Sequence, residues 1–261
     1  MLRFFINFLM TSLIFFPEKT HFETPKDYGL LFEDVFFKTA DGIKLHGWFL
    51  EAKPDPAGVL LFFHGNAGNI SGRLFKAKGW IKRGYSVFLA DYRGYGKSEG
   101  KIDHEEDVTK DAQAAWKWLR EENKFTEEKI IIFGESLGSH PAIRLGGLYR
   151  PKAVLLEAPF TSFIDLAKLH YGAIPGIDFL MRDFQFQNIN FISQINAPLF
   201  ILHGTSDETC PFEMSEKLMA KAPEPKELFS ISNGFHNDLP QKSGEAYWDK
   251  PVEFLQKTGS F

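Results

Sequence analysis

The chain has 261 residues, 44% of them hydrophobic and 15% aromatic, a content that supports one α/β domain with a large core and excludes global disorder. Its net charge of −4, with acidic and basic residues mixed along the chain, gives no basic surface for nucleic acid. The single cysteine, Cys210, excludes an intramolecular disulfide and a cysteine-rich metal site.

Residues 2–16 are nearly all apolar and end at Pro17. The run is shorter than the roughly 20 residues of a membrane-spanning helix, and its bulky end does not suit signal-peptide cleavage. We expect an apolar helix on the body of the protein or on a membrane surface; the alternative is an uncleaved anchor. The expected localisation is therefore cytoplasmic, or membrane-associated through the N-terminal segment 1–19, with one domain over 20–261.

Two strands over 31–39 and 43–50 flank Asp41-Gly42, a dipeptide typical of a tight hairpin, and predict an antiparallel edge. From Gly58 onward, strands and helices alternate, which predicts a mostly parallel sheet with helices on both faces. The strands expected there are 59–63, 87–90, 130–133, 154–156, 199–202 and 228–231, and the helices expected are 74–82, 105–120 and 213–221. A further helix is expected directly after residue 138, with Ala142, Ile143 and 145–148 on its apolar side. A terminal helix follows, with Pro251 near its first turn or at a kink.

The strand over 130–133 runs into Gly134-Glu135-Ser136-Leu137-Gly138, which has the G-x-S-x-G spacing of a nucleophile elbow. Glycines two residues either side of the serine permit a strand-to-helix turn that is too tight for a Cβ. The Ser136 hydroxyl would then be exposed at the end of the strand. The alternative is a glycine-rich turn in which Ser136 only caps a helix.

A serine hydroxyl becomes a good nucleophile when a histidine, oriented by a carboxylate, takes its proton. In folds with this elbow the chain order is serine, acid, histidine. His236 follows the last predicted strand in a polar loop and is the predicted base, the alternative being a surface histidine. Asp207 follows strand 199–202 at the carboxyl edge of the sheet and is the predicted acid. Glu157 is the second candidate for the acid and Asp238 the third.

Acyl transfer also needs two backbone N–H donors for the oxyanion. Leu137, the residue after the nucleophile, is the first expected donor. The second is expected in the loop over 64–69, where small residues permit close approach of the backbone. Asn66 is the predicted donor and Ala67 the second choice, while an ordinary turn is the alternative.

Residues 159–198 break the alternation with aromatic, glycine, proline and amide residues, and we interpret them as an inserted cap over the active site. Apolar residues of this stretch are candidates for an acyl pocket, about half of them being expected in internal packing. The candidates are Phe163, Leu166, Leu169, Tyr171, Ile174, Phe179, Leu180 and Met181.

Two further patterns are excluded on spacing. The segment Gly94–Ser98 resembles part of a phosphate-binding loop, but Asp91 stands where that motif needs glycine, and its glycines also miss the dinucleotide spacing. We interpret 91–94 as a turn beneath the active-site rim. No cysteine or histidine spacing typical of a metal site is present, so neither a metal nor a cofactor is expected. Cys210 is expected to be buried packing.

Together these motifs resemble the α/β-hydrolase superfamily and, within it, Bem46-like serine hydrolases and esterases. The matching segments are Phe16-Pro17, 64–69, 91–96, 134–138, His203-Gly204 with Asp207, and Gly234 with 236–238. The resemblance implies an α/β-hydrolase fold, with an eight-stranded, mostly parallel sheet flanked by helices and a small inserted cap. It also implies a Ser136/Asp207/His236 triad that acts without a cofactor.

The expected function is that of a serine carboxylesterase, which cleaves esters of short to medium acyl chain through an acyl-enzyme. The alternatives are the same triad acting on a thioester, a lipid or a protein acyl group, and a catalytically silent binding protein. The expected partner is a small ester or acyl substrate, with peripheral membrane contact through residues 2–16 as a further alternative. No nucleic acid is expected, and the sequence favours no oligomeric state.

Overall fold

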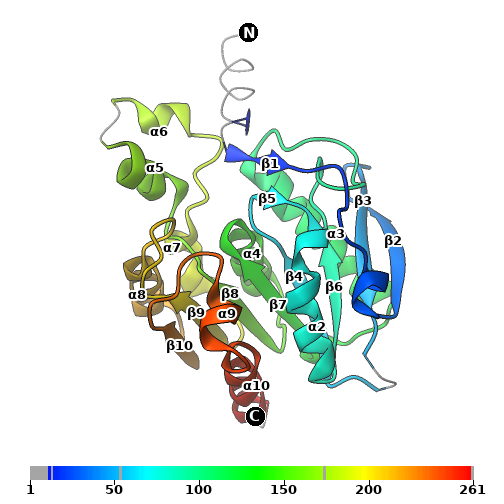
Figure 1. Ribbon diagram of the computed structural model, residues 1–261. Helices are drawn as coiled ribbons and strands as arrows, with labels where there is room; N and C mark the ends of the chain where they lie inside the picture. Colours follow the sequence, from blue (N-terminus) through cyan, green and yellow to red (C-terminus); the bar gives the residue numbers. More distant parts are fainter. Residues whose placement is uncertain (1–10, 13, 53–54, 173–174, 260–261) are drawn as a thin grey trace.

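A computed structural model describes residues 11–12, 14–52, 55–172 and 175–259 (Figure 1). Within these ranges, eight strands form one sheet in the order β10-β9-β8-β7-β4-β6-β3-β2. The strands are β2 (Phe32–Lys38), β3 (Lys44–Leu50), β4 (Gly58–Phe63), β6 (Tyr85–Ala90), β7 (Ile130–Glu135), β8 (Ala153–Glu157), β9 (Leu199–Gly204) and β10 (Lys226–Ile231). Among these strands, β3 alone runs in the opposite direction, so it is antiparallel to both β6 and β2, which confirms the mostly parallel sheet and its antiparallel edge.

Helices cover both faces of the sheet (Figure 1). The α-helices are α2 (Leu74–Lys82), α3 (Glu105–Glu121), α4 (Ser139–Leu148), α5 (Phe163–Tyr171), α6 (Ile177–Leu180), α7 (Asn188–Phe191), α8 (Phe212–Lys221), α9 (Leu239–Ser243) and α10 (Ala246–Thr258). Short 3-10 helices lie at η1 (Pro25–Tyr28), η2 (Ile70–Arg73), η3 (Glu127–Lys129), η4 (Ser136–Gly138) and η5 (Ile192–Gln194). Side chains of α3, α4 and α8 share one buried cluster, and those of α2 and α10 share another.

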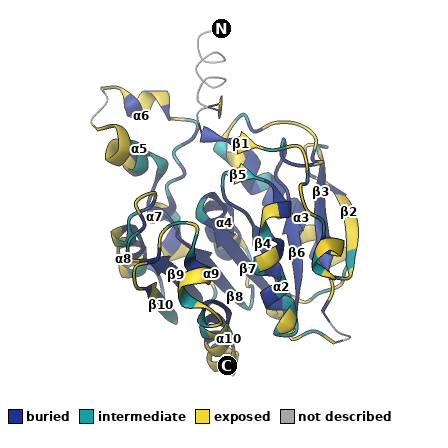
Figure 2. Cartoon of the chain, in the orientation of Figure 1, coloured by how far each residue is buried: buried dark blue, intermediate teal, exposed yellow. Residues whose placement is uncertain are grey.

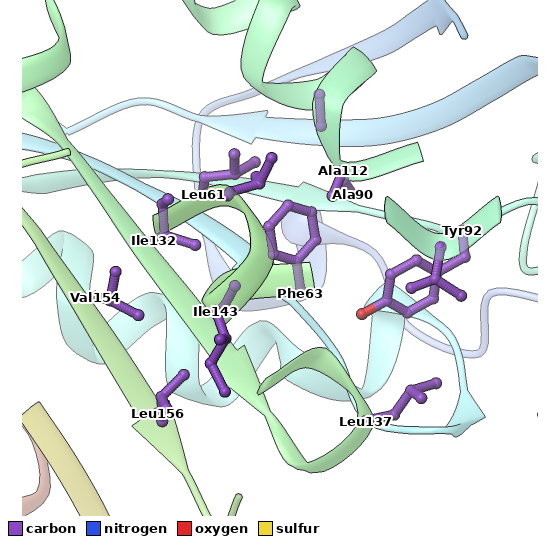
Figure 3. Close-up of a cluster of buried hydrophobic side chains, with 14 of the residues drawn as sticks. Leu61, Phe63, Ala90, Tyr92, Ala112, Ile132, Leu137, Ile143, Val154 and Leu156 are labelled. Atoms are coloured by element: carbon purple, nitrogen blue, oxygen red, sulfur yellow. The ribbon is translucent and has the colours of Figure 1, made fainter. Parts of the chain in front are cut away.

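The central strands are buried on both faces because successive side chains point to opposite sides of a sheet. We call the cluster that contains α3, α4 and α8 the α3/α4 cluster, and the one that contains α2 and α10 the α2/α10 cluster. In β4, Leu61 and Phe63 belong to the α3/α4 cluster, which Figure 3 shows, while Leu60 and Phe62 belong to the α2/α10 cluster. Figure 2 shows the resulting buried sheet between helices whose outer faces are exposed. Each such side chain contributes roughly 1.5–3 kcal/mol of burial free energy, so the sheet is a rigid support for the loops at its edge.

The N-terminal segment packs onto the protein. Ile14 and Phe15 are buried in the α3/α4 cluster, and the Phe15 ring lies 5.8 Å from the ring of Phe184. The next two residues form β1 (Phe16–Pro17), which pairs in parallel with β5 (Ala67–Gly68). This part of the segment is therefore held by core contacts and backbone hydrogen bonds.

The predicted membrane association through the N-terminal segment is corrected by this packing. In the part of the chain that the structure describes, no helix has the length and apolar character needed to cross a membrane. The apolar side chains of Ile14 and Phe15 are buried against the protein, which is why they are not available to a bilayer. Residues 1–10 and 13, on which the rest of that expectation falls, lie outside the described residues.

The stretch predicted as a cap, between β8 and β9, contains α5, α6 and α7 (Figure 1). A buried contact joins it to the sheet domain, because His140 in α4 donates from Nδ1 to Asn188 Oδ1 in α7 at 2.9 Å. The Asn188 amide donates in turn to Ser139 Oγ and to the Phe160 carbonyl. The pKa of His140 is lowered to about 3, mainly by burial and to a smaller extent by the nearby Arg144 charge, while the Asn188 contact acts in the opposite direction.

We therefore expect stability to fall as the pH is lowered from about 6.5 to about 3, because the unfolded chain gains a proton on His140 before the folded chain does. This one group contributes at most about 1.4 kcal/mol per pH unit in that window. Urea unfolding at pH 7, 5 and 4 measures the slope, which should be smaller in His140→Gln and unchanged in the exposed control His104→Gln. Equal slopes in wild type and His140→Gln would contradict this assignment.

Candidate active site

Ser136 lies at the turn between β7 and α4 in a left-handed backbone conformation, with φ of 51°. Its two flanking glycines are required by close backbone contacts. A Cβ at Gly134 would lie 2.3 Å from the Gly138 carbonyl oxygen, and one at Gly138 would lie 2.1 Å from the Phe63 carbonyl oxygen. A strained serine on a strand-to-helix turn is the geometry of a nucleophile elbow, and it presents the hydroxyl at the carboxyl edge of the sheet.

The structure brings the three predicted triad residues together. His236 Nε2 lies 3.1 Å from Ser136 Oγ, and His236 Nδ1 lies 2.7 Å from Asp207 Oδ2. With Nδ1–H donating to the carboxylate, Nε2 is free to accept the serine proton. The serine comes from the end of β7, the aspartate from the loop after β9 and the histidine from the loop after β10.

Asp207 is held as a charged group by several donors. Its Oδ1 accepts from the backbone N–H groups of Thr209 and Cys210 at 2.9 and 2.8 Å. Its Oδ2 lies 3.1 Å from His203 Nε2 as well as close to His236. Burial acts to raise the pKa of Asp207, but the contacts with His203 and His236 hold it well below its usual range. The carboxylate is therefore ionised at neutral pH and can orient the His236 imidazole.

The two predicted oxyanion donors border the same cavity as the nucleophile. Leu137 and Asn66 line a cavity of about 440 Å³ together with Ser136 and His236. The loop that carries Asn66 is fixed from both sides. Asn66 Nδ2 donates to the Ile14 carbonyl at 2.8 Å, while the Asn66 carbonyl accepts from Tyr95 Oη at 2.7 Å. Tyr95 lies just after the turn predicted over 91–94, and within that turn Tyr92 Oη donates to the His64 carbonyl at 3.0 Å.

The walls of the cavity are mainly apolar. Among the cap candidates, Phe163, Leu166, Tyr171 and Met181 line it, and the rings of Phe160 and Phe16 and the side chain of Ile14 add to its apolar wall. Leu169, Phe179 and Leu180 are exposed and lie outside that lining, and Ile174 lies outside the described residues. Polar side chains, among them Ser136, His236 and Arg73, also border it, so the cavity suits a ligand that has both an apolar part and a polar group.

Comparison with known proteins decides the family. Residues 54–188 match the family described as serine aminopeptidase, S33. The α/β hydrolase domain-containing protein WAV2 of Arabidopsis thaliana is 34% identical over 253 residues, covering 90% of this chain and 82% of that protein. The uncharacterized protein Rv2307c of Mycobacterium tuberculosis is 34% identical over 247 residues, covering 94% and 87%. The chain belongs to the α/β-hydrolase family.

The fold of this α/β-hydrolase is also found in solved structures. The Pyrococcus furiosus esterase Pf2001 superposes with a TM-score of 0.76 at 22% identity, over 94% of this chain and 97% of that one. At this identity the likeness is one of fold. The predicted superfamily and the predicted fold class are confirmed.

A network of buried charged side chains contacts the residue that precedes the nucleophile of the hydrolase. Glu135, next to the nucleophile, accepts from Arg73 Nη2 at 2.8 Å and from Lys76 Nζ at 2.9 Å. Lys76 Nζ also donates to Glu157 at 2.9 Å, and Tyr247 Oη donates to Glu157 Oε2 at 2.6 Å. Burial would raise the pKa of Glu135, yet the Arg73 and Lys76 charges keep it below its usual range. The network fixes the backbone on which the serine stands.

The other candidate acids have other partners. Glu157 serves the charge network just described, and Asp238 Oδ1 accepts from the Phe235 backbone N–H at 2.6 Å. Cys210 is buried as expected, but it also borders the cavity. Burial, and then the charge of Asp207, raise the pKa of its thiol, so it is protonated at neutral pH and a poor nucleophile.

Sequence reasoning missed two supporting residues of the hydrolase. His203, the last residue but one of β9, contacts both Asp207 and Ser215, whose Oγ lies 2.6 Å from His203 Nδ1. Arg73 lines the cavity and bonds Glu135. The position of His203, four residues before the acid, could have indicated this contact. His203 lies at the end of β9 and Asp207 in the loop that follows, so the two side chains are close together. No comparable signal pointed to Arg73, which comes from η2.

Proposed function

We propose that the protein is a serine esterase that hydrolyses carboxylic esters of short to medium acyl chain. The observation that carries this proposal is the continuous relay from Ser136 through His236 to Asp207 at the border of an apolar cavity of about 440 Å³. The relay supplies an activated alcohol, and the cavity supplies apolar surface for an acyl group.

In the proposed reaction, Ser136 Oγ attacks the ester carbonyl while His236 Nε2 takes its proton. The backbone N–H groups of Leu137 and Asn66 receive the oxyanion. The tetrahedral species collapses, the C–O bond to the alcohol breaks, and His236 returns the proton to the leaving oxygen. Water then attacks the acyl-enzyme by the same route, releasing the acid and free Ser136.

The dependence of kcat/KM on the length of the acyl chain tests which side chains border the acyl group. Each methylene that enters the cavity gains roughly 0.8 kcal/mol, so kcat/KM for p-nitrophenyl esters should rise about four-fold per carbon until the cavity is filled. Phe163→Ala removes a ring from the cavity wall and should move the optimum to longer chains. Leu169→Ala, an exposed change on the same helix α5 outside the lining, is the matched control.

An optimum that stays in place in Phe163→Ala would contradict the acyl pocket. Absence of turnover for every oxygen ester would contradict the esterase proposal itself, and acyl-thioesters are then the next substrates to measure. The two results separate an error in the pocket from an error in the reaction class.

A further inference from the structure

Two histidines and an aspartate gather beneath the loop that carries Asn66, apart from the triad. His21 precedes η1, His46 lies in β3 and Asp91 follows β6. One nitrogen of each imidazole and one carboxylate oxygen lie within 4.8 Å of one another. His21 Nε2 is 3.2 Å and His46 Nδ1 is 3.8 Å from Asp91 Oδ2.

The partner of His46 fixes which of its nitrogens carries a proton. His46 Nε2 lies 2.5 Å from Asp34 Oδ1, so Nε2–H donates to that carboxylate. Nδ1 is then left with a lone pair, although the whole residue is buried and no hydrogen-bond partner for Nδ1 is found among the described residues. A lone pair that faces a carboxylate at 3.8 Å is repelled unless a cation lies between them.

A second imidazole on the other carboxylate oxygen repeats this pattern. His64 Nδ1 lies 2.7 Å from the Gly65 carbonyl and donates to it, which leaves Nε2 with a lone pair. That atom is 3.3 Å from Asp91 Oδ1 and is also buried without a hydrogen-bond partner in the described part of the chain. His21 Nε2 lies within hydrogen-bond distance of Asp91 Oδ2, and the Ile70 N–H donates to Oδ1, yet the lone pairs of His46 Nδ1 and His64 Nε2 both face this carboxylate without a donor among the described residues.

Gly96 keeps the space beside two of these atoms free of a side chain. A Cβ at this position would lie 2.1 Å from Asp91 Oδ2 and 2.5 Å from His21 Nε2. Any other residue would therefore push into the gap between the carboxylate and the imidazole. On its other side the His21 ring packs 4.6 Å from the ring of Trp48, which fixes its direction.

We propose that His21 Nε2, His46 Nδ1 and Asp91 Oδ2 bind a divalent transition metal ion, Zn²⁺ fitting best. Bonds of about 2.1 Å in a tetrahedral site place two ligand atoms about 3.4 Å apart, between the observed 3.2 and 3.8 Å. Imidazole nitrogens favour zinc over Mg²⁺ and Ca²⁺, which prefer oxygen. A histidine that binds zinc through one nitrogen commonly donates from the other nitrogen to a carboxylate, which orients the ring. Asp34 accepts from His46 Nε2 in this way.

The ion would have a structural role. It would join the N-terminal segment at His21, the sheet at His46 and the end of β6 at Asp91. Asp91 also accepts from the Ile70 backbone N–H at 3.0 Å, so the same group anchors the start of η2. These connections support the loop over 64–69 without placing the ion at the reacting atoms.

The test uses the full chain without a histidine tag, after treatment with a chelator. Calorimetric titration with Zn²⁺ should show one equivalent bound, and Co²⁺ should give the visible absorption of a low-symmetry site. Excess Zn²⁺ at about 100 times its Kd should raise Tm by roughly 5 °C.

His21→Gln changes a half-buried loop residue and should weaken Zn²⁺ binding at least ten-fold, whereas the exposed control His104→Gln should bind as wild type. His46→Gln should act in the same direction, and His21→Gln decides the matter if that buried variant does not fold. Wild type that binds neither Zn²⁺ nor Co²⁺, or binding that His21→Gln leaves unchanged, would overturn the proposal.

Discussion

Ser136→Ala is expected to lower kcat for ester hydrolysis by about 10⁴-fold or more, with little change in substrate binding. The variant loses the attacking oxygen, while His236 and the cavity walls keep their positions. Only attack by a poorly placed water is left. Steady-state rates with a p-nitrophenyl ester and an unchanged Tm by circular dichroism measure both parts of this expectation.

Ser139→Ala is the matched control, because Ser139 is the next serine along the chain and its hydroxyl accepts from Asn188 Nδ2 at 3.2 Å, away from His236. This variant should keep activity to within several-fold, with a small loss of stability for one buried hydrogen bond. If Ser136→Ala kept more than about one per cent of the wild-type rate, another group would be the nucleophile.

Asp207→Asn should lower kcat by about 10⁴-fold while leaving the fold intact. The carboxylate accepts from His236 Nδ1 at 2.7 Å and lies 3.1 Å from His203 Nε2. An amide nitrogen in that place is a donor, so it favours the imidazole tautomer with hydrogen on Nε2. That tautomer cannot take the Ser136 proton. Single-turnover kinetics of acylation measure the loss directly.

Asp238→Asn is the control for the loss of a carboxylate charge near the triad. Asp238 lies in the same loop as His236, but it contacts a backbone N–H and not the imidazole. Its acylation rate should stay within several-fold of wild type. The opposite pattern, with Asp238→Asn slow and Asp207→Asn fast, would mean that the third candidate is the acid.

Local pattern was enough to predict most of the sheet and the triad. The apolar run over 130–133 and the glycines around Ser136 describe a strand and a tight turn whose causes lie within a few residues. The positions of Asp207 and His236 follow because each comes after a strand, and parallel strands end at one edge of the sheet. Element ends differ by one or two residues where polar residues continue a strand, as Lys226 does in β10.

Features that depend on tertiary contacts were beyond the sequence. The apolar run before Pro17 suits a membrane as well as a core, and only its packing against Phe184 places Phe15 inside the protein. Pro251 lies inside α10, past its first turn, because packing of that helix against the sheet outweighs one missing hydrogen bond to Tyr247. In α5, Phe163 faces the cavity and Leu169 faces solvent, a difference that composition does not encode.

Covalent labelling with a fluorophosphonate, followed by peptide mass spectrometry, tests most directly whether Ser136 is the activated nucleophile. The structure predicts one adduct per chain, located on Ser136, lost in Ser136→Ala and formed far more slowly in Asp207→Asn. An unlabelled wild-type chain, or an adduct on a different residue, would contradict the assignment of the relay from Ser136 through His236 to Asp207 as the catalytic machinery.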